Sequence, residues 1–416
     1  MERPLAGQRW LGLDASRRVQ DALEADGRPA RFVGGCVRDG LLGEADEQTD
    51  LDLATPEPPE RVQNLLARAR IRAVPTGYAH GTITAIIHPY RFEITTLRRD
   101  VRTDGRHAEV AFTDSFEADA ARRDFTINAM SCDRAGRLFD YFGGRDDLAR
   151  GRIRFVGAAP LRIGEDYLRI LRFFRFFARF GRPPPDPAAL AACRAQATTL
   201  RSLSGERIQT EMLKLLAAPR PGPSLRLMVE AGVATEAFGG PVALDRLERL
   251  LALRPDAPRL LRLAALLRPP PAAPGAAERV AGRWRLSRAD TRRLTEAVAG
   301  PAIDPRAEPR ALRRSMYVLG PERLADLASL AAADLGDFAR PALARAVAEA
   351  ARFERPELPV GGEDVLAAGV PPGPEVGRAL RALEAWWVER DFAPDRDACR
   401  ARLRDLIAAG PDPDAP

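Results

Sequence analysis

Two aspartates that stand two positions apart, Asp50 and Asp52, have the types and spacing for phosphoryl chemistry. They lie in the segment TDLDLAT, whose alternation of polar and apolar residues predicts a strand with both carboxylates on one side. Mg²⁺ prefers carboxylate and phosphate oxygens, and two such ions can hold the attacking and leaving oxygens of a phosphoryl displacement. An Asp-x-Asp pair is also common on exposed strands, so the metal-site interpretation depends on the segment that precedes it.

That segment, FVGGCVRD at residues 32–39, predicts a strand, a glycine turn at Gly34 and Gly35, and a helix. Glycines lack a Cβ atom, so their backbone amides can approach a triphosphate closely, and the N-terminus of the next helix favours negative charge. Arg38 lies one turn along and can bind phosphate oxygens through two hydrogen bonds. The fourteen residues between Gly35 and Asp50 suit a helix and a return to a neighbouring strand. Together the two segments predict a nucleotide site with Mg²⁺ on both aspartates.

The stretch EDYLRILRFFRFFARFG at residues 165–181 threads arginines among phenylalanines. It has three interpretations: an amphipathic core helix, a general RNA-binding stripe, or a reader of a nucleobase. If the stretch is one helix, Asp166, Arg169 and Arg172 share a stripe that Arg175 continues. Asp only accepts hydrogen bonds and Arg only donates them, which matches the amino group and ring nitrogen of cytosine and adenine. Uracil and guanine present the opposite order, so an Asp–Arg pair selects C and A. An ordinary ion pair on the helix is the alternative.

These segments, in this order, resemble the class II nucleotidyltransferases, which include the CCA-adding tRNA nucleotidyltransferases and the bacterial poly(A) polymerases. The resemblance covers residues 30–216 and leaves the last 200 residues with a compatible helical character only. Besides the segments above, it rests on FEITTLRRD, DGRHAEVAF, ARRDFTINAM, FDYFGGRDDL, RFVG and SGERIQTEMLKLL.

The resemblance implies roles for residues that spacing leaves undecided. It implies that Arg123 in ARRDFTINAM contacts the nucleotide. Asp166 and Arg169 correspond to the base-reading pair of the family. Arg172 and Arg175 then contact the nucleotide or support its pocket.

Glu93 and residues 104–112 keep two interpretations each, and Asn128 and Asp124 are given one each. Glu93 is either a third carboxylate near the metal ions or an exposed strand acid. Asn128 lies on the helix expected after Asp124 and is placed near the sugar, while Asp124 itself fits an N-cap of that helix. Residues 104–112 resemble the family's flexible loop, or form a plain surface loop.

The elements that must position these residues indicate an α+β protein. Residues 81–88 and 90–98 predict consecutive strands, and residues 137–157 predict a strand, a Gly-Gly turn and a short strand. From residue 161 the apolar spacing is helical throughout. The fold expected from the resemblance is a polymerase-beta-like nucleotidyltransferase head followed by all-α domains. The boundaries that we expect are 1–160 (head), 161–220 (neck with the base-reading helix), 221–350 (RNA-binding body) and 351–416 (tRNA-binding tail).

Composition gives weaker indications. The net charge is +6 and the pI about 9.6, which favours polyanionic partners such as RNA. All the basic residues except Lys214 are arginine, which also fits a coding bias. The four cysteines have no CxxC spacing, so neither a zinc site nor a disulfide framework is predicted. Without a signal-peptide pattern or an apolar run long enough to cross a bilayer, we expect a cytoplasmic protein without membrane contact.

Together with the metal and nucleotide sites predicted above, the resemblance implies a Mg²⁺-dependent enzyme that adds C, C and A to tRNA from CTP and ATP. Its RNA contacts are expected at the 3′ end and the acceptor region. The alternatives are a poly(A) polymerase, a partial CC-adding or A-adding enzyme, and a catalytically silent RNA-binding protein. The sequence leaves the oligomeric state undetermined.

Overall fold

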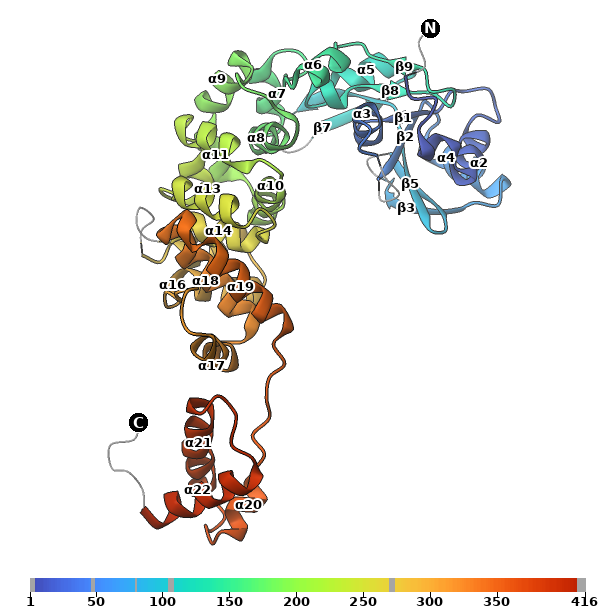
Figure 1. Ribbon diagram of the computed structural model, residues 1–416. Helices are drawn as coiled ribbons and strands as arrows, with labels where there is room; N and C mark the ends of the chain where they lie inside the picture. The colour runs from blue at the N-terminus through green and yellow to red at the C-terminus, as the bar shows by residue number, and fades with distance from the viewer. Residues whose placement is uncertain (1–3, 46–48, 79–80, 104–107, 269–273, 410–416) are drawn as a thin grey trace. The chain divides into compact units, whose positions relative to one another are not determined.

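The computed structural model describes residues 4–45, 49–78, 81–103, 108–268 and 274–409. The chain forms two compact units (Figure 1): the first comprises Met1–Pro241 with Arg279–Leu286, and the second comprises Val242–Glu278 with Ser287–Pro416. The first unit contains a mixed sheet followed by helices, and the second unit is helical. The α+β class predicted from the sequence is confirmed. The predicted loop at 104–112 falls partly on residues 104–107, which lie outside the described residues, and residues 108–112 form a paired strand instead of a loop.

A seven-stranded sheet in the first unit brings the predicted acids beside the glycine turn. Its strands are β1 (Arg31–Val33), β2 (Leu51–Thr55), β3 (Arg72–Gly77), β4 (Thr82–Ile87), β5 (Tyr90–Thr96), β8 (Ser131–Cys132) and β9 (Leu138–Phe139). The strand order across the sheet is β3-β4-β5-β2-β1-β8-β9. Strand β2 is parallel to β5 and antiparallel to β1. A separate hairpin consists of β6 (Arg98–Thr103) and β7 (Ala108–Phe112).

Alternation along β5 gives the sheet two unlike faces. Phe92 and Ile94 are fully buried, whereas Glu93 between them is exposed. Helix α4 (Pro59–Arg68) packs on β3, β4 and β5 and buries Leu65 and Leu66, so it covers the apolar face. The other helical elements of this part are α1 (Arg9–Gly12), α2 (Asp14–Leu23), α3 (Gly35–Leu42), α5 (Phe116–Ala121), η2 (Thr126–Asn128) and α6 (Gly144–Arg150).

The strands predicted at 81–88 and 90–98 are confirmed as β4 and β5. Two helical segments, α6 and η2, differ from the predictions. Within 137–157, the Gly-Gly turn leads into α6, because Gly143 takes a positive φ of 75° and two aspartates favour the first helical turn. The apolar helix expected after Asp124 is only the single turn η2. Asp124 is therefore not its N-cap: Phe125 holds that position, and the Asp124 carboxylate binds elsewhere.

The stretch at residues 165–181, which was predicted as one helix, is broken at Asp166. Helix α7 (Ala159–Glu165) ends before Asp166, whose backbone is extended, and α8 (Leu168–Phe180) begins after it. The interpretation that places Asp166 on one helical stripe with the arginines is therefore wrong. The core role of the phenylalanines is confirmed, since all five in α8 are buried.

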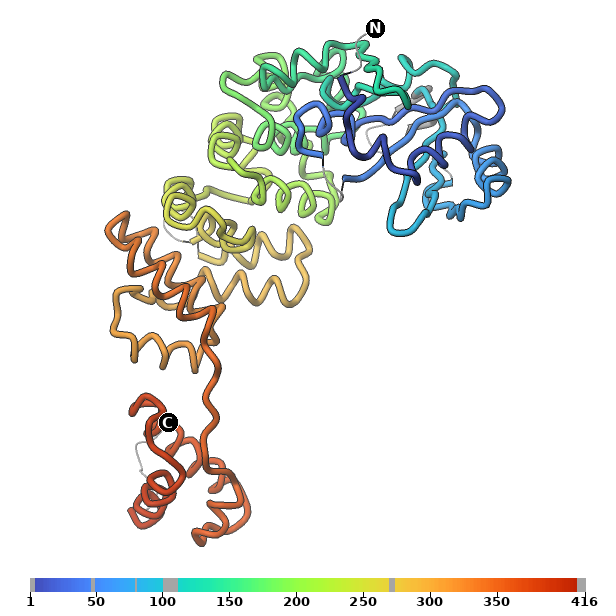
Figure 2. Tube along the Cα trace, turned by 45° about the vertical axis from the view of Figure 1, so that its right-hand side comes forward, coloured from blue at the N-terminus to red at the C-terminus, as the bar shows by residue number. Residues whose placement is uncertain are grey.

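After residue 161 the described chain is helical, as predicted, and Figure 2 shows it as successive helical turns. The first unit continues with α9 (Pro187–Ala195), η3 (Ala197–Ser202), α10 (Gly205–Ala217), α11 (Pro221–Glu230) and α12 (Val233–Phe238), and α15 (Ala276–Trp284) returns to it. The second unit contains α13 (Leu244–Leu253), α14 (Arg259–Leu267), α16 (Arg288–Ala299), α17 (Pro309–Leu319), α18 (Pro321–Leu335), η4 (Asp337–Ala339), α19 (Arg340–Arg352), α20 (Gly362–Ala367), α21 (Pro374–Glu389) and α22 (Arg396–Ala409). None of the helices in the described ranges has the length and apolar character needed to span a membrane.

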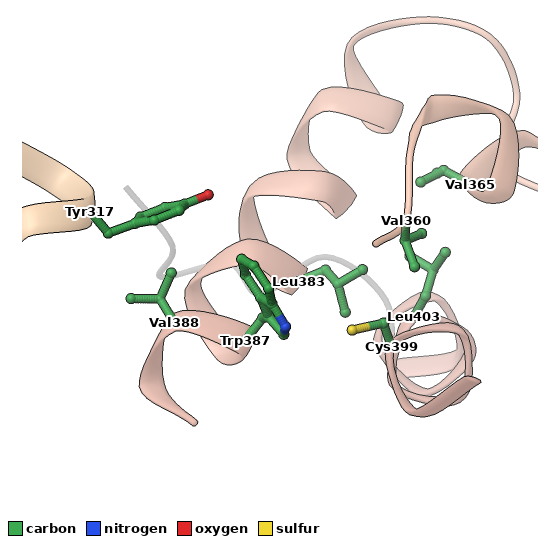
Figure 3. Packing of buried hydrophobic residues seen from close by; sticks show 8 residues of the cluster. All are labelled: Tyr317, Val360, Val365, Leu383, Trp387, Val388, Cys399 and Leu403. Atoms are coloured by element: carbon green, nitrogen blue, oxygen red, sulfur yellow. The ribbon is translucent and has the colours of Figure 1, made fainter. Parts of the chain in front are cut away.

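The last three helices share a small apolar cluster (Figure 3). Trp387 of α21 is buried in it, and its indole Nε1 donates a hydrogen bond to the carbonyl oxygen of Pro394 at 3.0 Å. Tyr317 of α17 joins the cluster, with its ring centroid 6.1 Å from that of Trp387. The cluster therefore ties α17 to the C-terminal helices.

Candidate active site

A cavity of about 560 Å³ lies in the first unit, where β1, β2 and β5 meet α3, α8 and α10. This volume lies within the usual range for small-molecule sites, about 300–1,000 Å³. Charged side chains dominate its lining. The residues that line it are Val33, Gly34, Gly35, Arg38, Asp52, Glu93, Thr95, Arg98, Arg122, Arg123, Asp124, Asn128, Asp166, Leu168, Arg169, Arg172, Phe176 and Arg207. Of the predicted site residues, only Asp50 and Arg175 are not among these lining residues.

Two carboxylates stand side by side at the base of the cavity. Asp52 on β2 is in register with Glu93 on the parallel strand β5. Burial raises the pKa of Asp52 to about 7, with added repulsion from Glu93 and Asp50 and partial relief from Arg123. Asp50 is exposed just before β2. Glu93, which had two interpretations, thus lies where it can share a cation with Asp52.

The donor set suits a divalent ion bound partly by its substrate. In the described ranges, no group of three or more His, Cys, Asp or Glu side chains is arranged to hold a metal ion. Mg²⁺ is commonly held by one or two carboxylates together with substrate phosphates. The raised pKa of Asp52 marks a carboxylate whose negative charge lacks sufficient compensation nearby. A divalent cation would supply that compensation, so the residues fit such an ion.

The glycine turn takes a conformation that requires glycine. Gly34 has φ +70°, and a Cβ atom there would lie 3.1 Å from Nη1 of Arg123. Helix α3 begins directly after this turn at Gly35. Arg38, one turn into α3, is buried and donates a hydrogen bond from Nη1 to Oδ1 of Asn128 at 2.6 Å. The turn, the helix and both arginines therefore form one wall of the cavity.

Asp124 is a functional residue that the sequence interpretation missed, because an N-cap explained it equally well. The carboxylate is buried and accepts hydrogen bonds from the Phe125 amide (2.8 Å), Nδ2 of Asn128 (3.1 Å) and Nε of Arg172 (2.6 Å). Burial by itself would raise the pKa of Asp124, but the charge of Arg172 and these hydrogen bonds outweigh it and lower the pKa. Asp124 therefore fixes Asn128 and Arg172 at the cavity wall.

The predicted base-reading residues both line the cavity, each with its own partner. The Asp166 carboxylate accepts hydrogen bonds from Nη2 of Arg207 at 2.8 and 2.9 Å. Nη1 of Arg169 donates to Glu165 at 2.5 Å, and its Nη2 donates to the carbonyl oxygen of Arg122 at 3.1 Å. Arg207 was missed as a site residue. The sequence pointed to Arg207 only through the segment SGERIQTEMLKLL, which is part of the family resemblance but was given no functional role.

The two remaining arginines of α8 converge on one buried acid. Nε of Arg175 lies 2.6 Å from Oε2 of Glu211, and Nη1 of Arg172 lies 3.7 Å from Oε1. Glu211 on α10 is 4% exposed. Arg172 borders the cavity, whereas Arg175 stands behind it against the Phe176 ring. Of the two roles expected for this pair, the position of Arg175 fits support of the pocket.

Comparison with known proteins places this chain in a family. Residues 30–154 match a family model described as the poly A polymerase head domain, and residues 185–243 match one described as a probable RNA and SrmB-binding site of polymerase A. The CCA-adding enzyme of Limosilactobacillus fermentum is 31% identical over 410 residues, which cover 95% of this chain and 98% of that protein. The chain belongs to the CCA-adding enzyme family.

Other members extend the comparison. The mitochondrial CCA tRNA nucleotidyltransferase 1 of Danio rerio is 48% identical over 207 residues, or 49% of this chain, and the chain spans about half (48%) of that relative's length. The solved CCA-adding enzyme of Bacillus stearothermophilus in complex with CTP has a TM-score of 0.77 and 30% identity, covering 98% of this chain and 99% of that one. The head with helical domains that the resemblance predicted is thus the fold of the CCA-adding enzyme family.

Proposed function

We propose that this protein adds C, C and A to the 3′ end of tRNA from CTP and ATP, without a nucleic-acid template and with release of pyrophosphate. The observation that carries the proposal is the single cavity that joins Asp52 and Glu93, the glycine turn at Gly34, and the pair Asp166 and Arg169. A nucleoside triphosphate in this cavity can have its phosphates at the turn and its base near Asp166. Similarity to CCA-adding enzymes over nearly the full chain supports the same activity.

Mg²⁺ is the divalent ion that we propose for Asp50 and Asp52, with Glu93 as a third candidate ligand. When bound, Mg²⁺ supplies positive charge that activates the attacking hydroxyl and stabilises the departing pyrophosphate. Gly35 and Arg38 would hold phosphate oxygens at the start of α3, and Arg123 would contact the nucleotide beside them.

Base choice is assigned to Asp166 and Arg169. The Asp166 carboxylate retains acceptor capacity beyond its hydrogen bonds to Arg207 and to the Leu168 amide, so it can accept from a base amino group. Arg169 would donate to the ring nitrogen of cytosine or adenine. Arg172 and Arg175 support this pocket through Asp124 and Glu211.

The partner that we propose is tRNA, bound through its 3′ end and acceptor region. The division into a head (1–160), neck (161–220), body (221–350) and tail (351–416) is kept as part of this proposal, with the arginine-rich body and tail binding phosphates. Such contacts are sensitive to salt and largely independent of sequence. The cytoplasm is the compartment that we propose, because all four cysteines are free thiols.

A second candidate is a bacterial-type poly(A) polymerase, which the match of residues 30–154 to the poly A polymerase head domain favours. One experiment separates the two. The protein is incubated with Mg²⁺, tRNA that lacks its 3′ end, and each labelled nucleotide singly and combined. Addition of C, C and A followed by arrest supports our proposal. Long A tails would support the polymerase, addition of CC or A alone a partial enzyme, and no incorporation a silent RNA-binding protein.

A further inference from the structure

Two cross-strand rows of side chains continue outward from the catalytic carboxylates across the sheet. Glu93 of β5 is in register with Thr84 of β4, which is in register with Val74 of β3. Two residues further along, Arg91 is in register with Ile86, which is in register with Arg72. Because alternate residues share a face, all six side chains lie on the face of the sheet that carries Asp52. We call these six residues the open face.

The open face is polar and basic where it meets solvent. Arg72, Arg91 and Glu93 are exposed, whereas Thr84 between them is buried and shares a hydrogen bond of 2.7 Å with Thr76. Within the described ranges, neither Arg72 nor Arg91 forms an ion pair with an acidic side chain. The opposite face is apolar and carries α4. Among the described residues, the open face thus carries two exposed arginines without an acidic partner, with Arg91 on the strand of Glu93 and Arg72 two strands away.

The order of the strands decides which substrate can lie there. In a phosphoryl displacement, the attacking and leaving oxygens stand roughly in line on opposite sides of the phosphorus. The glycine turn and α3 follow β1, on one side of β2, and they are the proposed phosphate site. The strands β5, β4 and β3 lie on the other side of β2. A hydroxyl in line with phosphates held at that turn would arrive over Glu93, from the open face.

We propose that the open face binds the 3′-terminal nucleotides of the acceptor RNA, with Arg91 and Arg72 on their phosphates. This inference rests on the proposed function and adds to it the path of the acceptor strand. Glu93 belongs to the open face and also lines the cavity, so the terminal sugar lies beside it. The next phosphates toward the 5′ side then meet Arg91 first and Arg72 beyond it. Arginine suits such contacts because its guanidinium binds phosphate oxygens bidentately.

The test uses the full chain with Arg91→Ala, Arg72→Ala and the double variant. The control is Arg68→Ala, which removes an arginine with a 61% exposed side chain from α4, the helix on the opposite face. We expect each single variant to raise the KM for tRNA about 5- to 10-fold and to reduce the salt slope of tRNA binding by about 1. The KM for CTP and the melting temperature should stay unchanged. The control should behave like the wild type.

Equal KM values for tRNA in the open-face variants and the control would overturn this proposal, as would an effect confined to the KM for CTP. Failure of the proposed function has a different signature, because the wild type would then add no CCA. A charge-reversed Arg91→Glu variant gives a second measurement. It should weaken tRNA binding more than Arg91→Ala at low salt, and the two should converge at high salt.

Discussion

The Asp52 carboxylate is partly buried and stands next to Glu93 on the neighbouring strand. Burial and repulsion from Glu93 raise the pKa of Asp52 to about 7, so its ionised form costs stability in the folded state. Between the ordinary pKa of an unfolded aspartate and pH 7, the folded state binds more protons than the unfolded state. The wild type therefore loses stability as the pH rises through this window.

Asp52→Asn removes this ionisable group without changing its size. We expect nucleotide transfer to fall at least about 1000-fold, which corresponds to about 4 kcal/mol of transition-state stabilisation. The variant should melt at a higher temperature than the wild type in chelator, with a larger difference at pH 8 than at pH 5. Thermal unfolding at both pH values and a transfer assay measure these effects.

Asp146→Asn is the matched control, because that aspartate is 76% exposed on α6. It should leave both activity and melting temperature unchanged. Retained transfer by Asp52→Asn would contradict the catalytic assignment, and a larger stabilisation at pH 5 would contradict the pKa argument.

Arg207 donates hydrogen bonds to Asp166, so under the proposed function it is a positioning residue for the base. Arg207→Ala should remove the Nη2 donor that both Asp166 oxygens share and reduce the preference for CTP over UTP at least about tenfold. Arg207→Lys should restore part of this preference. The measurement is kcat/KM for each nucleotide. A lower rate with unchanged preference would mean that Arg207 has only a structural role.

Arg285→Ala provides the control for this substitution. Arg285 pairs with Glu206, the residue before Arg207, in an exposed ion pair. Exposed pairs contribute little to stability. We therefore expect wild-type preference and stability from the control.

At the scale of elements, the strand, glycine turn and helix from β1 to α3 set the distance between the phosphate site and the acids. The positive φ of Gly34 turns the chain so that α3 starts directly at the cavity. This arrangement followed from sequence, since a strand pattern, two glycines, a helix pattern and then the aspartates stand in this order at residues 31–52. The single turn η2 and helix α6 did not follow from sequence. Their short segments are held by contacts such as the hydrogen bond from Oγ1 of Thr126 to Asp147 at 2.7 Å.

Gly34→Ala tests this turn. A side chain at positive φ costs about 1–3 kcal/mol, and here its Cβ atom would also press on Arg123. We expect lower stability and raised KM values for both CTP and ATP. Gly27→Ala is the matched control, because Gly27 also has a positive φ, +82°, but no atom lies within 4 Å of the added Cβ. It should lose stability but keep both KM values. Equal effects on KM in the two variants would contradict the role of the turn.

At the scale of the whole molecule, nucleotide chemistry and the C-terminal cluster belong to different compact units. Substitutions in the cluster should therefore separate RNA handling from nucleotide binding. Trp387 is its largest buried side chain, and Figure 3 places it between Leu383 and Val388 of α21 on the side of Tyr317.

Trp387→Ala should destabilise the packing of α20–α22 by about 3–5 kcal/mol. We expect an early unfolding transition and weaker addition to tRNA, with CTP binding unchanged. Calorimetric unfolding, CTP titration and the addition assay measure the three effects. The neighbouring half-buried Trp386 supplies the control, since Trp386→Ala should cost less. Loss of CTP binding in Trp387→Ala would contradict the independence of the two units.

The sequence by itself determined the parts of this protein that depend on local order: Asp52 on a strand that begins directly after Asp50, the glycine turn before Arg38, the buried phenylalanines, and the helices after residue 161. Strand alternation and glycine conformation are local properties, so neighbouring residues suffice to reveal them. Only the tertiary structure decided which distant groups meet. It paired Asp52 with Glu93, Asp124 with Arg172, and Asp166 with Arg207. Such pairings depend on strand order and helix packing, which no local pattern encodes.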